Sequence, residues 1–137
     1  YFFTLLQVRW RRMNAAEIAA YCLRKQHVTQ TYPFGSIPVC FKLNGRIFAQ
    51  LYPDSDFFRL TLKCTREMGE FYRRVYPEKV RRGYHCPPVQ QPYWNTIDLE
   101  NFPSDALMMM IDQAYDTVLN GFPRRIREQL TQGANAP

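Results

Sequence analysis

The chain has 137 residues and a formal net charge of +6, with 18 Lys and Arg against 12 Asp and Glu. This length is typical of one domain, and a hydrophobic share of 46% supplies enough apolar side chains for a single core, which excludes a disordered protein. No apolar run approaches the ~18 residues of a membrane span. The apolar opening YFFTLLQV precedes its arginines, whereas a signal peptide has the reverse order. We therefore expect a cytoplasmic protein with no membrane partner.

The first residues stand apart from the rest of the sequence. Met13 is followed at once by a sequence typical of a capped helix, so we expect residues 1–12 to be an N-terminal extension, not native to the domain and dispensable for folding. This extension carries three arginines and no acidic residue, which leaves +3 of the +6 for the chain from Met13. The remaining sequence shows no internal boundary. We expect a single domain over 13–131 and a frayed tail over 132–137.

The first predicted helix covers residues 14–25. Asn14 followed three positions later by Glu17 is the pattern of a capping box, in which each residue's side chain bonds the other's backbone N–H. Residues 26–37 contain proline and glycine, and we expect them to form a loop with at most a short extended piece.

The clearest local signal is Asn44-Gly45, which lies between two apolar runs at 39–43 and 46–51. A two-residue turn of this composition tolerates positive φ at both positions and predicts a β-hairpin. Its expected register sets Phe41 opposite Phe48. A third strand is predicted over 57–64, where apolar residues alternate with polar ones. We expect that strand to be half-buried, with one polar and partly basic face: Arg59, Thr61 and Lys63.

A second helix is predicted over 66–76 after the N-cap Thr65. Its expected core stripe is Met68, Phe71, Tyr72, Val75 and Tyr76. A long loop to about residue 92 and a fourth strand over 93–99 follow. Ser104 is the expected cap of a third helix over 105–120, and a short basic helix is expected from Arg124 to about Leu130. The predicted fold class is α+β. We expect an antiparallel sheet of about four strands, a hairpin meander plus one strand after a helix, packed with three to four helices.

No catalytic, metal or cofactor constellation is recognisable in the sequence. The four cysteines lack a C-x-x-C spacing, so we expect small buried thiols, with Cys86 the most exposed. Asp112 and Asp116 share a helix face without a further ligand, which favours a solvated face. We therefore expect a protein that is not an enzyme and that uses no cofactor.

Nine short segments, in this order and spacing, are similar to the MmcQ/YjbR family of small bacterial proteins. They span the chain from about Asn14 to Leu130. The segments are Tyr32-Pro33-Phe34-Gly35, Val39-Cys40-Phe41-Lys42, Gly45-Arg46-Ile47-Phe48-Ala49, Leu60-Thr61-Leu62-Lys63-Cys64, Tyr76-Pro77, Gly83-Tyr84-His85, Trp94-Asn95-Thr96, Asp112 through Tyr115 and Gly121 through Arg125. The resemblance implies a double-wing-like α+β fold and DNA binding. Between His85 and Trp94 many members are shorter and carry lysines, whereas this chain reads CPPVQQPY and is uncharged there.

DNA binding through backbone phosphates is the leading functional hypothesis. The candidate phosphate contacts are the basic residues expected at the surface: Arg59, Lys63, Lys79, Arg81, Arg82, Arg124, Arg125 and Arg127. If they gather on one face, phosphate binding is favoured. If they scatter among the acidic residues, they are ordinary solubilising charge. The sequence leaves both readings open.

The alternative hypothesis is a module that binds a protein segment or a small ligand. Its expected groove lies along the aromatic and proline-rich stretch: Tyr84, His85, Tyr93, Trp94 and Asn95. A purely structural role for these residues is left open as well. A strand Trp is commonly a core anchor, an Asn at a strand edge commonly bonds the neighbouring loop, and a lone His is commonly structural.

Overall fold

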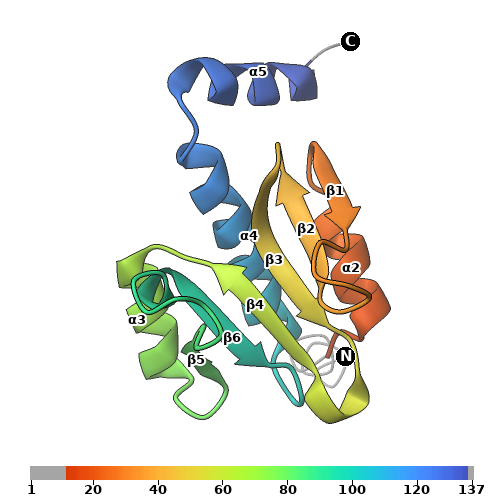
Figure 1. Cartoon of the computed structure of the whole chain (residues 1–137), viewed down its shortest axis with the longest axis vertical. Coiled ribbons are helices and arrows are strands. Elements are labelled where there is room, and N and C mark those ends of the chain that lie inside the picture. The colour runs from red at the N-terminus through yellow and green to blue at the C-terminus, as the bar shows by residue number, and fades with distance from the viewer. Residues whose placement is uncertain (1–11, 136–137) are drawn as a thin grey trace, which may run out of the picture.

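The computed structural model describes residues 12–135, with side chains described through residue 132, so most of the expected extension 1–12 lies outside the described residues. Its centre is a six-stranded sheet in which every neighbouring pair is antiparallel (Figure 1). In spatial order the strands are β1 (Val28–Thr31), β2 (Val39–Leu43), β3 (Arg46–Tyr52), β4 (Arg59–Lys63), β6 (Trp94–Asp98) and β5 (Val80–Arg82). The α+β class and the antiparallel sheet are confirmed.

Four α-helices and two short 3-10 turns complete the described fold. The helices are α2 (Ala15–Leu23), α3 (Arg66–Val75), α4 (Ser104–Asn120) and α5 (Arg124–Asn135), and the turns are η1 (Ser55–Phe57) and η2 (Gln91–Tyr93). Within this part of the chain, no helix is long and apolar enough to cross a membrane.

The expected count of about four strands is too low, because two short strands add to it. β1 is the short extended piece within the expected loop 26–37, and β5 lies in the long segment expected as loop up to about residue 92. β1 has four residues and β5 has three, too few for an alternating pattern to be visible in the sequence. Both are edge strands, and each exists through its hydrogen bonds to one neighbour, β1 to β2 and β5 to β6. Their formation therefore depends on tertiary pairing.

The hairpin at Asn44-Gly45 is confirmed, with φ of 48° and 85° at the two turn residues. The expected pair of Phe41 with Phe48 is wrong. A bulge shifts the register, so that Phe41 lies opposite Ala49. The extra residue, Phe48, instead packs edge-on against Tyr115 of α4, with ring centroids 5.7 Å apart.

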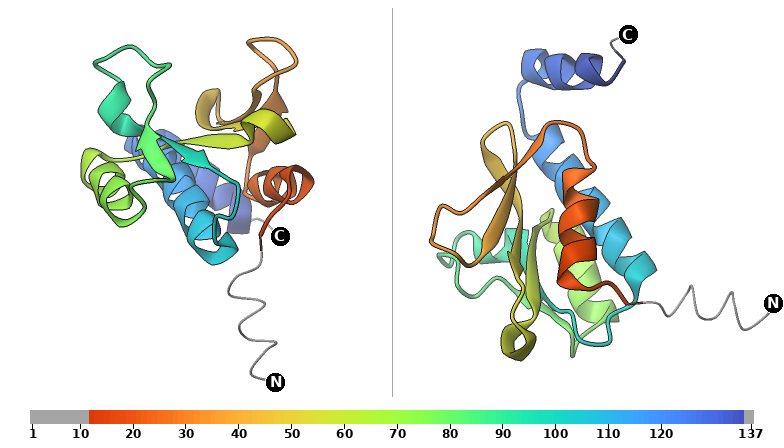
Figure 2. Two further views of the ribbon diagram at one scale, coloured as in Figure 1. Left: turned by 90° about the horizontal axis from the view of Figure 1, so that it is seen from below. Right: turned by 90° about the vertical axis from the view of Figure 1, so that its right-hand side faces the viewer.

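Helices α2, α3 and α4 cover one face of the sheet and leave the other face open (Figure 2, left). Loops rise above the open face on two sides, one between β1 and β2 and one between β5 and β6. The core lies between the sheet and the helices. Its largest fully buried members include Phe41, Phe48, Leu60, Ile97 and Ile111.

Local helix signals are largely confirmed. Asn14 and Glu17 form both bonds of the capping box, at 3.1 and 2.8 Å, and Thr65 caps α3 at 3.2 Å. Ser104, expected as a cap, is the first residue of α4, because the extended N-cap position falls on Pro103. α5 reaches Asn135 rather than about Leu130, so regular helix continues into the expected tail 132–137.

The expected core stripe of α3 is partly wrong. Tyr72 is buried, but Phe71 and Val75 are about half exposed. α3 lies at the end of the sheet formed by the short strand β5, which offers too little surface to cover a wide stripe. The solvated face expected for Asp112 and Asp116 is found in part. Asp116 is exposed, whereas the Asp112 side chain is 45% exposed and accepts hydrogen bonds from the Tyr21 hydroxyl of α2 and from Lys25, which follows that helix.

Candidate functional site

Three alternate cross-strand pairs of β4 and β6 face away from the helices. Arg59 lies opposite Asp98, with 3.1 Å between Nη1 and Oδ1. The hydroxyls of Thr61 and Thr96 lie 2.9 Å apart and share a hydrogen bond. The third pair, Lys63 and Trp94, lies at the other end of the row. The common orientation expected for Arg59, Thr61 and Lys63 is thus confirmed. That face is less exposed than expected, because Thr61 is fully buried.

Lys63 lies against two aromatic rings. Its ammonium is 5.1 Å from the Trp94 ring and 5.6 Å from the Tyr93 ring, within the range of cation–π attraction. Burial lowers the pKa of Lys63 from its usual value. Arg59 makes a similar contact, with its guanidinium carbon 5.1 Å from the Phe57 ring. Two cations of the open face are therefore each paired with an aromatic surface.

Neighbouring strands extend this face on both sides. Tyr52 of β3 lies opposite Arg59, and Arg81 of β5 lies opposite Thr96. Tyr52 also contacts the Phe57 and His85 rings edge-on, with centroids 5.3 and 6.4 Å away. We call the surface formed by Tyr52, Phe57, Arg59, Lys63, Lys79, Arg81, Trp94 and Thr96 the open sheet face.

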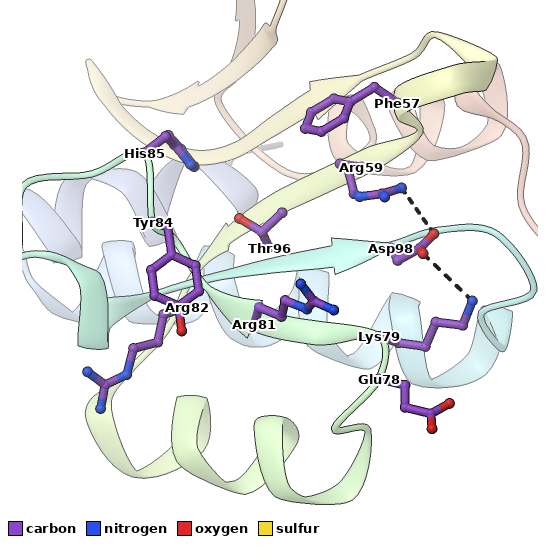
Figure 3. Close-up of a pocket in the computed structure, with 10 residues that line it drawn as sticks. All are labelled: Phe57, Arg59, Glu78, Lys79, Arg81, Arg82, Tyr84, His85, Thr96 and Asp98. Atoms are coloured by element: carbon purple, nitrogen blue, oxygen red, sulfur yellow. Dashed lines mark hydrogen bonds and ion pairs between the residues drawn. The ribbon is translucent and has the colours of Figure 1, made fainter.

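A hollow of about 370 Å³ lies at the β5 edge of the open sheet face (Figure 3). Its lining residues are Phe57, Arg59, Glu78, Lys79, Arg81, Arg82, Tyr84, His85, Thr96 and Asp98. Four of the eight expected phosphate contacts and two of the five expected groove residues therefore meet here.

The four cations of the hollow differ in their partners. Arg59 and Lys79 both pair with Asp98, at 3.1 and 3.8 Å, and Lys79 also donates to the Glu100 carbonyl at 2.8 Å. Arg81 makes no ion pair or hydrogen bond through its side chain among the described residues. Arg82 points away from Arg81, toward the side of the sheet that carries α3 (Figure 3). Arg81 is thus the cation most available to a ligand.

Tyr84 and His85 form the wall of the hollow nearest the β5–β6 loop. Tyr84 is 68% exposed, so its ring is free to contact a ligand. Partial burial of the His85 ring lowers its pKa below the usual value of 6.5.

Asn95 does not line the groove expected with Tyr93 and Trp94. Consecutive strand residues point to opposite faces, so Asn95 faces α3 and is 1% exposed. Its side chain accepts from Arg73 at 2.6 Å and donates to the Gly69 carbonyl at 3.2 Å. It bonds a helix rather than the neighbouring loop, and its role is structural.

The basic residues of α5 do not join the hollow. Arg124, Arg125 and Arg127 lie on a helix at the opposite end of the molecule's long axis from β5 (Figure 1). Arg124 pairs with Glu128 at 2.9 Å, and Arg127 is half-buried. The expected phosphate contacts therefore divide between two distant surfaces.

Sequence reasoning missed Tyr52 and Phe57. The alternation along β3 could have identified Tyr52, but Phe57 belongs to a turn that has no such pattern.

Three cysteines are buried and Cys86 is half-buried, as expected. Over residues 12–135, no group of three or more His, Cys, Asp or Glu side chains is placed to hold a metal ion.

Comparisons with known proteins give the family. The chain is similar in structure to protein DR2400 of Deinococcus radiodurans, described as a DUF419 domain, with a TM-score of 0.77 and 27% identity over 86% of this chain and 88% of that one. A Pseudomonas syringae protein shares the fold, with a TM-score of 0.59 and 18% identity over 74% and 96% of the two chains. The search of curated proteins found no match. The sequence profile of the YjbR family matches residues 23–117, and the chain belongs to this family.

Proposed function

We propose that this protein binds nucleic acid through the open sheet face and that the binding involves no catalysis. The observation that carries the proposal is the gathering of Arg59, Lys63, Lys79 and Arg81 on one face, two of them against aromatic rings. Cations supply contacts to phosphate, and aromatic rings supply stacking surfaces for bases. Membership of the YjbR family is compatible with this role.

The charge balance of the hollow supports anion binding. Four cations line it, against the carboxylates of Glu78 and Asp98. Asp98 pairs with Arg59 and Lys79 and partly offsets their charge, whereas Arg81 has no carboxylate partner among the described residues. We therefore assign to Arg81 the principal phosphate contact and to Arg59 and Lys79 a supporting one.

The test is fluorescence anisotropy with a labelled 20-base single strand and with its duplex. Binding to either form should weaken steeply between 50 and 200 mM salt, because each neutralised phosphate releases counterions. Arg81→Ala should weaken binding about tenfold and reduce the slope of log K against log salt by about 1. Arg125→Ala on α5 is the matched control and should leave both quantities unchanged. Absence of binding to both forms at 50 mM salt would reject the proposal.

Exposed apolar residues of the β5–β6 loop favour a second candidate, recognition of a protein segment. Tyr84 and Val89 are 68% and 78% exposed, so both side chains of this loop present apolar surface to a partner. In a pull-down, a Tyr84→Ser, Val89→Ser double variant should lose a partner that the unaltered protein retains. Retention of the same partners by the double variant would remove this candidate.

A further inference from the structure

The shape and chemistry of the open sheet face favour one form of nucleic acid. We infer that this face binds a single strand, with bases stacked on its aromatic rings and phosphates on its cations. The inference rests on the proposed nucleic-acid binding and narrows it to a substrate class.

The width of the face opposes insertion into a duplex. Four neighbouring strands, β3, β4, β6 and β5, carry the residues of this surface. With strands about 4.8 Å apart, the outer two axes are about 14 Å from each other before any side chain is added. The major groove of B-DNA is about 12 Å wide and accepts a helix or a two-stranded ribbon. In addition, the loops on either side rise above the level of the sheet (Figure 2, left), and the face is hollowed at its β5 edge.

The aromatic rings are placed for contact with unpaired bases. Tyr93 is 37% exposed beside Lys63, and Tyr84 is exposed at the wall of the hollow. Stacking requires the flat face of a base, which a duplex keeps covered by its neighbouring base pairs. A flexible single strand presents that face without the cost of unstacking a helix.

Cations and rings are paired at two points along the sheet, where a strand of phosphates and bases needs both. Lys63 lies against Tyr93 and Trp94 at one end of β4, and Arg59 lies against Phe57 at the other. These two positions are four residues apart, about 13 Å at ~3.3 Å per residue. Arg81 lies beside the row on β5. The face thus offers ring and charge together at two separated points, which suits more than one nucleotide.

The experiment compares four labelled probes by anisotropy at one salt concentration: dT12, U12, a 12-unit abasic DNA strand and a 12-bp duplex. We expect dT12 or U12 to bind at least tenfold more tightly than the abasic strand and the duplex. The comparison of dT12 with U12 identifies DNA or RNA as the preferred strand. Equal binding of the abasic strand, or equal or tighter binding of the duplex, would overturn the inference while leaving the proposed function intact. Failure of all four probes to bind would overturn both.

Variants locate the stacking surface. Tyr84→Ala and Tyr93→Ala should reduce binding of the preferred strand at least fivefold and leave binding of the abasic strand unchanged, because each removes a ring but no charge. Phe71→Ala is the matched control, since this ring is also half exposed but belongs to α3, which packs on the other side of the sheet. If the Tyr84→Ala, Tyr93→Ala double variant still favoured the preferred strand over the abasic strand as much as the unaltered protein does, the assignment of these rings would be overturned.

Discussion

Arg73 of α3 donates a 2.6 Å hydrogen bond to the side chain of Asn95, a residue of β6 that is almost completely buried. Asn95 in turn donates to the Gly69 carbonyl one turn earlier in the same helix. This bridge fixes α3 against the strand whose other face carries Thr96 and Trp94. The position of the open sheet face therefore depends on a polar contact behind it.

Asn95→Ala should destabilise the protein by about 2–3 kcal/mol. The change removes a hydrogen bond to a charged group and takes from the buried Gly69 carbonyl the side-chain donor that it has in addition to its helix. Urea denaturation is the measurement, and the midpoint should fall at an unchanged m-value. Asn120→Ala, at an exposed position at the end of α4, is the control. A loss below about 0.5 kcal/mol is what a surface substitution costs, and it would contradict the structural role of Asn95.

Gly69→Ala should destabilise the protein, although Ala is favoured over Gly inside a helix by about 1 kcal/mol. A β-carbon at this position would lie 2.8 Å from the Cys64 sulfur and 3.2 Å from the Pro92 carbonyl oxygen. We expect a net loss of about 1–2 kcal/mol in thermal or urea unfolding. Adding Cys64→Ala should recover part of the loss, because it removes the nearest obstructing atom. A stabilising Gly69→Ala would mean that α3 lies farther from β4 than the structure indicates.

Thr61 and Thr96 should show strong coupling in a double-mutant cycle. Each single change to Val leaves the remaining hydroxyl without the partner now 2.9 Å away, at a cost of about 1–2 kcal/mol. The double change removes both hydroxyls and should cost clearly less than the sum of the singles. Additive urea-unfolding energies would show that the two hydroxyls do not depend on each other.

The sequence predicts best where structure is determined locally. The Asn44-Gly45 turn and the caps at Asn14 and Thr65 depend on residues within three positions of one another, and all three are confirmed. The register predicted for the hairpin is wrong, because the bulge at Phe48 follows from packing against Tyr115. That residue comes 67 positions later in the chain.

The candidate site was predictable only in part. Alternation along β4 identified Arg59 and Lys63 as neighbours on one face. The gathering of Lys79 and Arg81 beside them depends on β5, a three-residue strand that exists only through its pairing with β6. Nothing in the sequence separates these cations from those of α5, because the separation follows from the path of α4 through the whole molecule.

Stability should fall at alkaline pH, and Cys22 should contribute to the loss. Burial between α2 and the sheet raises the pKa of this thiol from 9 to about 12. Between these values the unfolded chain has lost the thiol proton while the folded protein retains it. The contribution to stability is therefore complete below pH 9 and declines as pH rises toward 12, by up to about 1.4 kcal/mol per pH unit.

The measurement is the free energy of unfolding at pH 9 and at pH 10.5, for the unaltered protein and for Cys22→Ala. The substitution leaves a small cavity and lowers stability at both values, so the decisive quantity is the change between them. That change should be smaller in Cys22→Ala by about 1–2 kcal/mol, because one titrating group has been removed. Cys86→Ala, which alters a half-buried thiol, should reduce the change less. Identical pH dependence in Cys22→Ala and the unaltered protein would contradict the burial of a protonated thiol at this position.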